Sequence, residues 1–438
     1  MSIKPKLGFF DTTIVVISLV IGIGIFRTPA MVAKEAGTPT IFFACWIAGG
    51  ILCLFGALTF AEIGSRKPYA GGFYKLASDA YHPAFAFMLN WLGLLISSGA
   101  TFAAVALLAS EYITPLIPIA GITSPVGLKL TAVGLILVLF IINYTGIKSG
   151  ATTLNILTTV KVAIILILCI SAFVFSNVTP ESKILANNSN AFNAFGLGLI
   201  SVFFTYGGYQ LTMNLAADVK NPNKNLKWGI LLGAFVIIFV YLLTNVAYYK
   251  ILGLEGISNS PLIAADVAKV IFGETGGKII SIVIFISALG FLNVTLMHTP
   301  RTFLAIAEDG ALPEIFKRVN QKTQTQEFTL IFLTTLSLFF LLVEGQFEKI
   351  INLIMFNDNL TIAFVASTIF IFRYRDSKKE YGGFKSPLYP VIPAIFIFFL
   401  VLVSFYAFSK DITAGLLSTA VFLLGYPIFL LFKKFVKK

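Results

Sequence analysis

Apolar stretches of about 20 residues recur along the chain, each followed by a short polar or charged segment. With a rise of about 1.5 Å per residue, an α-helix of this length crosses the roughly 30 Å hydrocarbon core of a membrane. The pattern predicts an all-α integral membrane protein with twelve transmembrane helices. The expected spans cover residues 9–36, 40–64, 84–113, 128–144, 151–175, 191–217, 228–251, 278–307, 328–342, 350–372, 389–408 and 412–432.

Two of these spans contain glycines where a transmembrane helix is normally continuous. The first holds Gly22 and Gly24, followed by Pro29, and the sixth holds Gly207 and Gly208. Glycine costs about 1 kcal/mol relative to alanine inside a helix, and its bare backbone can leave helical geometry. Exposed N–H and C=O groups are tolerated in a membrane only beside protein or an aqueous cavity. A broken helix that forms a substrate site is one interpretation, and close helix packing through small residues is the other.

The two glycine-containing spans are five helices apart, which indicates an internal repeat. They would cross the membrane in opposite directions, so residues 1–176 and 177–385 would form two five-helix units of inverted topology. Residues 386–438 would add two peripheral helices and a basic tail. Counted from apolar starts near Ile14 and Phe195, the two breaks lie roughly 14 and 16 Å deep, near the membrane midplane. Interrupted helices at corresponding positions of two repeats point to a transporter binding site.

Composition and charge agree with a membrane protein. Of the 438 residues, 57% are hydrophobic and 12% are charged, whereas soluble proteins carry about 25% charged residues. The net charge of +12 does not indicate a nucleic-acid partner, because most Lys and Arg lie in segments expected on the cytoplasmic side. This distribution predicts a protein of the cell (inner or plasma) membrane with cytoplasmic termini. The N-terminus leads into a full-length span with no small-residue cleavage site, so no removable signal peptide is expected. Cys45, Cys53 and Cys169 have neither disulfide nor metal-site spacing, so no metal or cofactor is expected.

Two ionisable residues inside the expected spans are candidates for coupling transport to a second event. Lys161 lies roughly 14 Å into the fifth span, a depth that its side chain does not cover. It could switch between neutral and charged forms, or act as a fixed cation in place of Na⁺. Asp358 lies roughly 12 Å into the tenth span, where a carboxylate could take up protons or contact a cationic substrate.

The ends of the spans carry further candidates. Glu62 is expected at the cytoplasmic end of the second span, as a topology anchor or a gate contact. On the outer side, Ser260 and Pro261 resemble a helix start, and the apolar spacing that follows predicts a short amphipathic helix. This helix would be either a lid over an outer vestibule or a surface helix on the lipid interface.

The broken helices also indicate the chemistry of a ligand. Exposed N–H groups at the start of a half-helix favour a carboxylate, and free carbonyls at the end of another favour an ammonium group. An α-amino acid carries both groups on one carbon, although any small zwitterion or polar solute would satisfy the same pattern. With two histidines and no nucleophile–base spacing, the sequence does not indicate an enzyme.

Five short segments occur in a distinctive order. They are Gly22-Ile23-Gly24-Ile25-Phe26 with Pro29, Pro68 with Gly71, Gly72 and Tyr74, Phe204-Thr205-Tyr206-Gly207-Gly208, Val219-Lys220-Asn221-Pro222, and Arg301 followed by Asp309-Gly310-Ala311-Leu312-Pro313. Together they resemble the amino acid-polyamine-organocation (APC) superfamily of permeases over nearly the whole chain. The resemblance implies the LeuT fold, with five plus five inverted helices and two peripheral ones.

The resemblance also implies roles for individual residues. At the first break, beside Gly22, the substrate carboxylate would meet the amides of Ile23, Gly24 and Ile25. The ammonium group would meet the carbonyls of Val20, Phe204, Thr205 and Gly207, and Phe204 or the neighbouring Phe203 would form part of a gate. Lys161 matches a lysine that many sodium-independent members carry. Ile23 departs from the pattern, because it replaces the usual small hydroxyl residue and removes one side-chain contact.

The sequence therefore predicts a sodium-independent amino-acid transporter that works by alternating access, either exchanging neutral amino acids or using the proton gradient. One alternative is a permease for cationic amino acids or polyamines, with Asp358 as the counter-charge. Another is a membrane sensor that does not transport. The expected partners are a small zwitterionic amino acid, the lipid bilayer and, for proton-coupled uptake, protons. The residues give no indication for or against a partner subunit.

Overall fold

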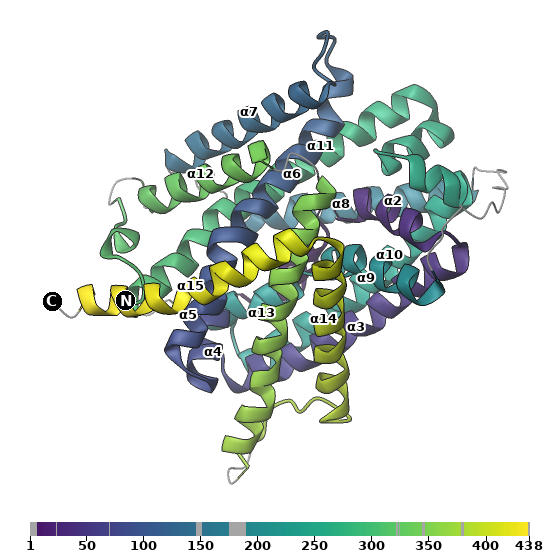
Figure 1. Cartoon of the computed structure of the whole chain (residues 1–438). Helices are drawn as coiled ribbons and strands as arrows, with labels where there is room; N and C mark the ends of the chain where they lie inside the picture. Colours follow the sequence, from purple (N-terminus) through teal and green to yellow (C-terminus); the bar gives the residue numbers. More distant parts are fainter. Residues whose placement is uncertain are drawn as a thin grey trace.

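The computed structural model (Figure 1) describes residues 7–22, 24–69, 71–145, 151–174, 190–320, 323, 325–343, 347–377 and 381–436. All regular elements within these ranges are helices, which confirms the predicted all-α class. The helices pack into a single bundle in which segments far apart in the sequence lie side by side.

The first half of the described chain contains ten helical elements. They are α1 (Phe9–Val20), α2 (Gly24–Ala36), α3 (Pro39–Arg66), α4 (Gly72–Ala80), α5 (Pro83–Leu92), a π-helical turn η1 (Gly93–Ser97), α6 (Ser98–Ile113), a 3₁₀ turn η2 (Thr114–Leu116), α7 (Pro125–Tyr144) and α8 (Ala151–Val174). Helix α4 lies between the second and third expected spans, where the sequence pattern predicts no helix. With 9 residues, it is too short to show the pattern of a membrane span.

The second half contains nine elements. They are α9 (Ala191–Tyr206), a 3₁₀ helix η3 (Tyr209–Asp218), α10 (Pro222–Asn259), α11 (Ile263–Glu308), a 3₁₀ turn η4 (Glu314–Lys317), α12 (Glu327–Val343), α13 (Phe347–Arg375), α14 (Val391–Lys410) and α15 (Ile412–Val436). The backbone of Gly273 kinks α11 with a φ of 73°. The expected short amphipathic helix is the segment of α11 before this kink.

The number of membrane-length helices agrees closely with the sequence pattern. Nine helices of the described residues are long and apolar enough to cross a membrane, or ten if α1 and α2 count as one broken span. Two shorter apolar helices, Thr158–Val174 and Glu327–Val343, occur where the fifth and ninth spans are expected. Each expected span thus has a helical counterpart, and the count of twelve remains a prediction.

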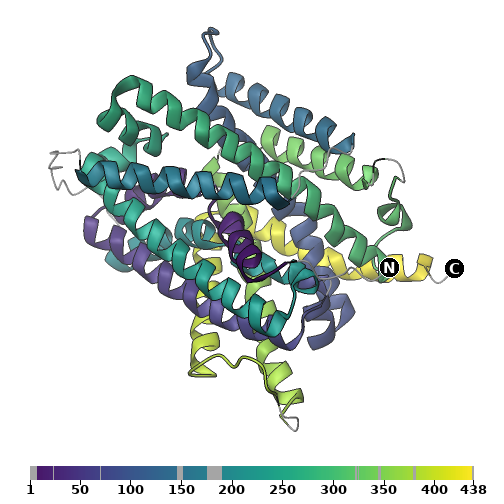
Figure 2. The ribbon, with the colours of Figure 1, turned by 180° about the vertical axis from the view of Figure 1, so that it is seen from behind.

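The two broken spans run in opposite directions. The N–H of Lys220, just after η3, donates a hydrogen bond of 2.9 Å to the carbonyl of Leu7, just before α1. The first broken span therefore begins where the second one ends. Figure 2 shows α1, in purple, between α8 and α10, which both pack against it.

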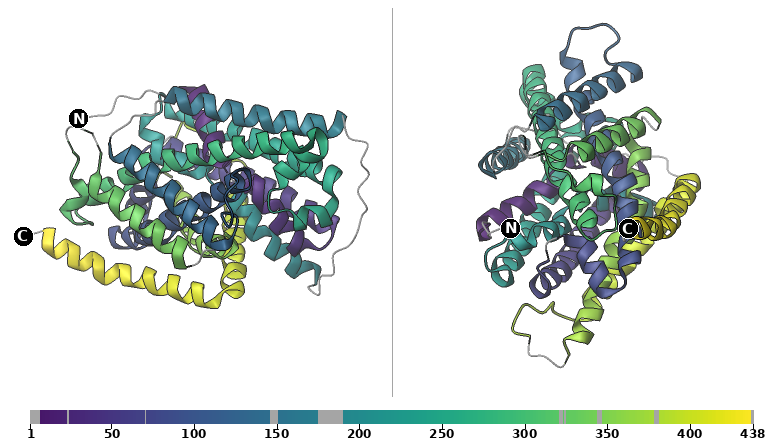
Figure 3. Two further views of the ribbon diagram at one scale, coloured as in Figure 1. Left: turned by 90° about the horizontal axis from the view of Figure 1, so that it is seen from above. Right: turned by 90° about the vertical axis from the view of Figure 1, so that its left-hand side faces the viewer.

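The C-terminal helix lies at the edge of the bundle. Both views of Figure 3 show α15, in yellow, along the outside of the other helices. Many of its exposed side chains are apolar, and they include Leu416, Leu417, Leu423, Leu424 and Leu431. An apolar exposed face is typical of a helix that contacts lipid, in agreement with the predicted peripheral position.

A buried ion cluster joins the C-terminal ends of α3 and α13. Glu62 is fully buried, and its carboxylate accepts hydrogen bonds from Arg66 Nε at 2.8 Å, Arg373 Nε at 2.8 Å, Arg373 Nη2 at 2.6 Å and the N–H of Ser386 at 2.6 Å. Arg66 also donates to Asp376 at 3.0 Å. The cluster ties two helices and the segment before α14 to one carboxylate, so Glu62 is a packing centre of the bundle.

Two aromatic rings cover the arginines of this cluster. The guanidinium carbon of Arg66 lies 3.8 Å from the ring centre of Tyr381, and that of Arg373 lies 3.7 Å from the ring centre of Tyr389. Burial raises the pKa of the Tyr381 hydroxyl to about 12. The ring is therefore uncharged at neutral pH, and its contact with Arg66 is a cation–π interaction.

We expect Glu62→Ala to destabilise the protein strongly, since it leaves two arginines close together without their shared carboxylate. Breaking a buried ion pair typically costs about 3–5 kcal/mol. Thermal unfolding of the purified protein in detergent should show a clearly lower Tm. The matched control is Glu314→Ala, which removes an exposed carboxylate 3.5 Å from Lys317 and should leave the Tm within experimental error. Equal melting of the two variants would contradict a structural role for the cluster.

Candidate substrate site at the two helix breaks

The first broken span consists of α1 and α2, with the break between them. The axes of the two helices differ by 44°, and the backbone leaves helical geometry at Ile21, with φ −72° and ψ 73°. The N–H of Gly22 turns back to the carbonyl of Val20 at 2.6 Å. Helix α2 then starts at Gly24, and its first N–H groups have no acceptor within the helix. Ile23 lies outside the described residues.

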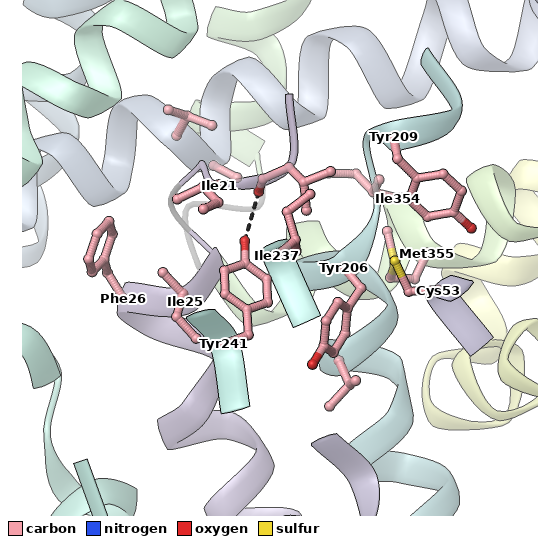
Figure 4. Close-up of a cluster of buried hydrophobic side chains, with 14 of the residues drawn as sticks. Ile21, Ile25, Phe26, Cys53, Tyr206, Tyr209, Ile237, Tyr241, Ile354 and Met355 are labelled. Carbon is pink, nitrogen blue, oxygen red and sulfur yellow. Dashed lines mark hydrogen bonds between the residues drawn. The ribbon is translucent and has the colours of Figure 1, made fainter. Parts of the chain in front are cut away.

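Side chains from two other helices satisfy the carbonyls at the end of α1. The ammonium group of Lys161, on α8, donates to the Ile21 carbonyl at 2.7 Å, and this lysine is 8% exposed. The hydroxyl of Tyr241, on α10, donates to the Val20 carbonyl at 2.9 Å, which is the dashed line in Figure 4. The predicted intramembrane lysine is thus bound to the backbone of the first break itself.

The second break is closed by its own chain. Gly207 adopts an extended conformation and donates to the Phe203 carbonyl at 2.9 Å. Gly208 has a φ of 122°, which side-chain-bearing residues rarely adopt. Its N–H, which would continue the helix by bonding to Phe204, instead donates to Gln210 Oε1 at 2.9 Å. The Phe203 carbonyl thus keeps its helical donor, whereas the N–H of Gly208 is turned away from α9 toward Gln210.

The two breaks contact each other directly. A Cβ atom added to Gly208 would lie 2.4 Å from the carbonyl oxygen of Leu19, and one added to Gly24 would lie 3.0 Å from the Cα of Thr205. The hydroxyls of Thr28 and Thr205 also share a short hydrogen bond across α2 and α9. Both glycines are thus required by close backbone approach, so packing and a broken helix occur together at this place.

Polar contacts join α2 to α6 and to the segment before α11. Arg27 Nη1 donates to the Pro261 carbonyl at 2.9 Å and lies 3.8 Å from the carboxylate of Glu111. The hydroxyl of Tyr112 donates to the Phe26 carbonyl at 3.1 Å. The first segment of α11 follows Pro261, and its residues Ile263, Ala264, Val267 and Ala268 are fully buried. This segment packs on protein, as a lid would, while its Val270 and Phe272 remain exposed.

A small pocket lies beside the second break, between α3, α9, α13 and α14. It holds about 330 Å³ of empty space including its open mouth. Phe203, Gly207, Gln210 and Asn359 contribute to its lining. Cys53, Tyr206 and Tyr209 also line it, and Figure 4 shows these three side chains close together. Among the residues that the structure describes, no three His, Cys, Asp or Glu side chains could hold a metal ion.

Comparison with known proteins identifies the family of the chain. A family model described as "Amino acid permease" matches residues 7–429. The chain belongs to the amino acid permease family. This permease is 29% identical to the serine/threonine exchanger SteT of Bacillus subtilis (strain 168), over 99% of its own length and 98% of that protein.

Relatives in animals are similar along nearly the whole permease. The large neutral amino acids transporter small subunit 2 of Mus musculus is 27% identical, over 98% of this chain and 81% of the transporter. The human cystine/glutamate transporter is 26% identical, over 99% of this chain and 87% of the transporter. These matches confirm the resemblance that the sequence motifs suggested.

Most of the predicted site residues of the permease lie at the two breaks. Val20, Gly22, Gly24 and Ile25 belong to the first break, Phe203, Phe204, Thr205 and Gly207 belong to the second, and Lys161 is bound between α8 and α1. Asp358 is partly exposed on α13 and lies beside Ser97 of the π-helical turn. The next residue, Asn359, lines the pocket beside the second break.

Sequence reasoning missed three residues of this region. Tyr241 gave no signal, because a single tyrosine in an apolar span is ordinary. Gln210 directly follows the second glycine pair, and Asn359 belongs to the polar run around Asp358. Both could have been predicted as site residues, because they are polar and lie close to the glycine pair or to Asp358. The residues of other helices that surround them could not have been predicted.

We expect Gly208→Ala to abolish most of the transport activity of the permease. The added methyl group would overlap with the backbone of Leu19 and strain a backbone whose φ is 122°. Overpacking of this kind costs about 1–3 kcal/mol. The measurements are substrate uptake into liposomes and the Tm. Gly134→Ala on α7 is the control, because its Cβ would meet nothing within 4 Å, and it should retain wild-type uptake. Normal uptake by Gly208→Ala would contradict the contact between the breaks.

Proposed function

We propose that this permease exchanges amino acids across the cell membrane by alternating access and does not require Na⁺. Its membership of the amino acid permease family supports transport of amino acids. The names of two relatives support the proposal, since one is a serine/threonine exchanger and another is a cystine/glutamate transporter. Proton-coupled uptake is the other mode that the same fold supports.

The bond between Lys161 and the Ile21 carbonyl is the observation that carries this proposal. A buried ammonium group at 2.7 Å from a free carbonyl of the first break supplies the positive charge that a bound Na⁺ would otherwise supply. An intramembrane lysine is costly and is usually functional. A transporter with this lysine therefore has no need for a sodium ion at the same carbonyl.

The rest of the proposed site is a clamp for a zwitterion. The N–H groups at the start of α2, from Gly24 onwards, would receive the carboxylate, and the last carbonyls of α9 would receive the ammonium group. Direct contact between the breaks supports this arrangement, because it brings the two half-helix ends together. The Val20 carbonyl already accepts from the N–H of Gly22 and from the Tyr241 hydroxyl, so a substrate ammonium group would have to replace one of these two donors.

We also propose that residues 1–176 and 177–385 are inverted repeats and that residues 386–438 are a peripheral addition. The opposite directions of the two broken spans support this division. In this orientation the chain would place both termini in the cytoplasm, in agreement with the positive-inside distribution of Lys and Arg.

Transport into proteoliposomes tests the proposed function. Uptake of labelled amino acids should require an amino acid inside the vesicle, should be the same in sodium and choline buffers, and should not follow an imposed pH gradient. If a pH gradient drives uptake into vesicles that contain no amino acid, the mechanism is proton-coupled uptake and not exchange. A strict requirement for Na⁺ would contradict the role assigned to Lys161.

We expect Lys161→Ala to lower the exchange rate by about 10- to 100-fold, since hydrogen bonds to charged groups contribute about 1.5–3 kcal/mol. The control is Lys250→Ala, which removes a partly exposed lysine that donates to the Phe173 carbonyl of α8 at 3.0 Å. The control should exchange at the wild-type rate. The Tm of each variant shows whether it folds, and wild-type exchange by Lys161→Ala would make the lysine purely structural.

A further inference from the structure

The pocket beside the second break contains a polar group that the protein leaves unused. Asn359 is 2% exposed, and its side-chain nitrogen has no hydrogen-bond partner in the described structure. Buried donors without a partner cost free energy, and folded proteins contain few of them. Since Asn359 lines the pocket, a bound group with an acceptor atom would satisfy this donor.

A second carboxamide lies in the same pocket. Gln210 is buried, and its Oε1 already accepts from the N–H of Gly208 at 2.9 Å. This bond commits the oxygen of Gln210 to the break and leaves its nitrogen as the atom that can donate to a ligand. Two donors from two elements, η3 and α13, therefore line one small space.

The remaining lining excludes charged and large ligands. Phe203, Ile362, Phe396 and Leu400 are apolar, and none of the residues that line the pocket in the described structure is Asp, Glu, Lys or Arg. A charged group would be costly in such surroundings because it would have no counter-charge. With about 330 Å³ including the mouth, the pocket accommodates a few heavy atoms.

We propose that this pocket receives the substrate's side chain and that Asn359, together with Gln210, selects short uncharged side chains with an oxygen acceptor, namely hydroxyl and carboxamide groups. The inference rests on the proposed function, because Phe203 and Gly207 belong both to the pocket and to the clamp for the amino acid. An apolar side chain of the same size fills the space but leaves the buried donors unpaired, so it binds more weakly.

Threonine and valine provide the test, because their side chains have nearly the same shape and differ in one hydroxyl group. In competition for exchange, we expect the wild-type permease to prefer threonine by about 10-fold or more. Asn359→Leu should bring the threonine-to-valine ratio close to one while valine exchange continues. Asn90→Leu is the control, because Asn90 bonds to its own helix, α5, at the Ala86 carbonyl and is not part of the pocket lining. Its ratio should equal that of the wild type.

The outcomes separate this inference from the proposed function. If no amino acid is exchanged, the proposed function fails. If amino acids are exchanged but threonine and valine compete equally in the wild type, the donor of Asn359 binds water only and the inference is wrong. An unchanged ratio in Asn359→Leu also overturns it. Should Asn359→Leu fail to fold, as judged by its Tm, Asn359→Ala removes the same donor with less bulk and is judged by the same ratio.

Discussion

The structure depends on one constraint, that backbone carbonyls freed inside a membrane must find donors. Two carbonyls are freed where α1 ends, and donors reach them from two different helices: Lys161 of α8 bonds to Ile21, and Tyr241 of α10 bonds to Val20. At Lys161, the donor and the acceptor each require the other. A buried ammonium group is costly without an acceptor, and the freed carbonyl is costly without a donor, so each makes the other tolerable.

The second break is closed differently, because the group that finds a new partner there is an N–H rather than a carbonyl. Gly207 and Gln210 close it with bonds inside its own segment. Side chains of other helices therefore bind the carbonyls of the first break, whereas the hydrogen bonds of Gly207 and Gly208 stay within the second segment. A movement of α8 or α10 relative to α1 acts on the first break, whereas the second can keep its shape. This asymmetry matches a site in which one half-helix is sensitive to conformation and the other presents a fixed set of carbonyls.

Much of this arrangement could be predicted because its signals are local. Paired glycines in an apolar span indicate a break, and a lysine far from both span ends indicates a buried cation. The partners could not be predicted, because they depend on how distant helices pack. Nothing in the sequence marks Tyr241 as the donor to Val20. In the polar run Asn357-Asp358-Asn359, the charge of Asp358 made it the predicted site residue. The face of α13 that borders the pocket instead carries Asn359. Helix α4 was missed because it lacks the length of a membrane span.

The proposed site divides recognition between two kinds of group. Backbone atoms at the breaks would bind the α-carboxylate and α-ammonium, which every amino acid shares, and glycine is needed there for close approach rather than for selectivity. Side chains from η3, α13 and α14 would read the variable part of the substrate. Residues such as Asn359 can therefore change without disturbing the contact between Gly208 and Leu19. This separation accounts for a family whose members, at 26 to 29% identity to this chain, bear the names of transporters for serine and threonine or for cystine and glutamate. In the proposed site, backbone packing constrains the clamp, whereas the side chains of the pocket can vary with the substrate.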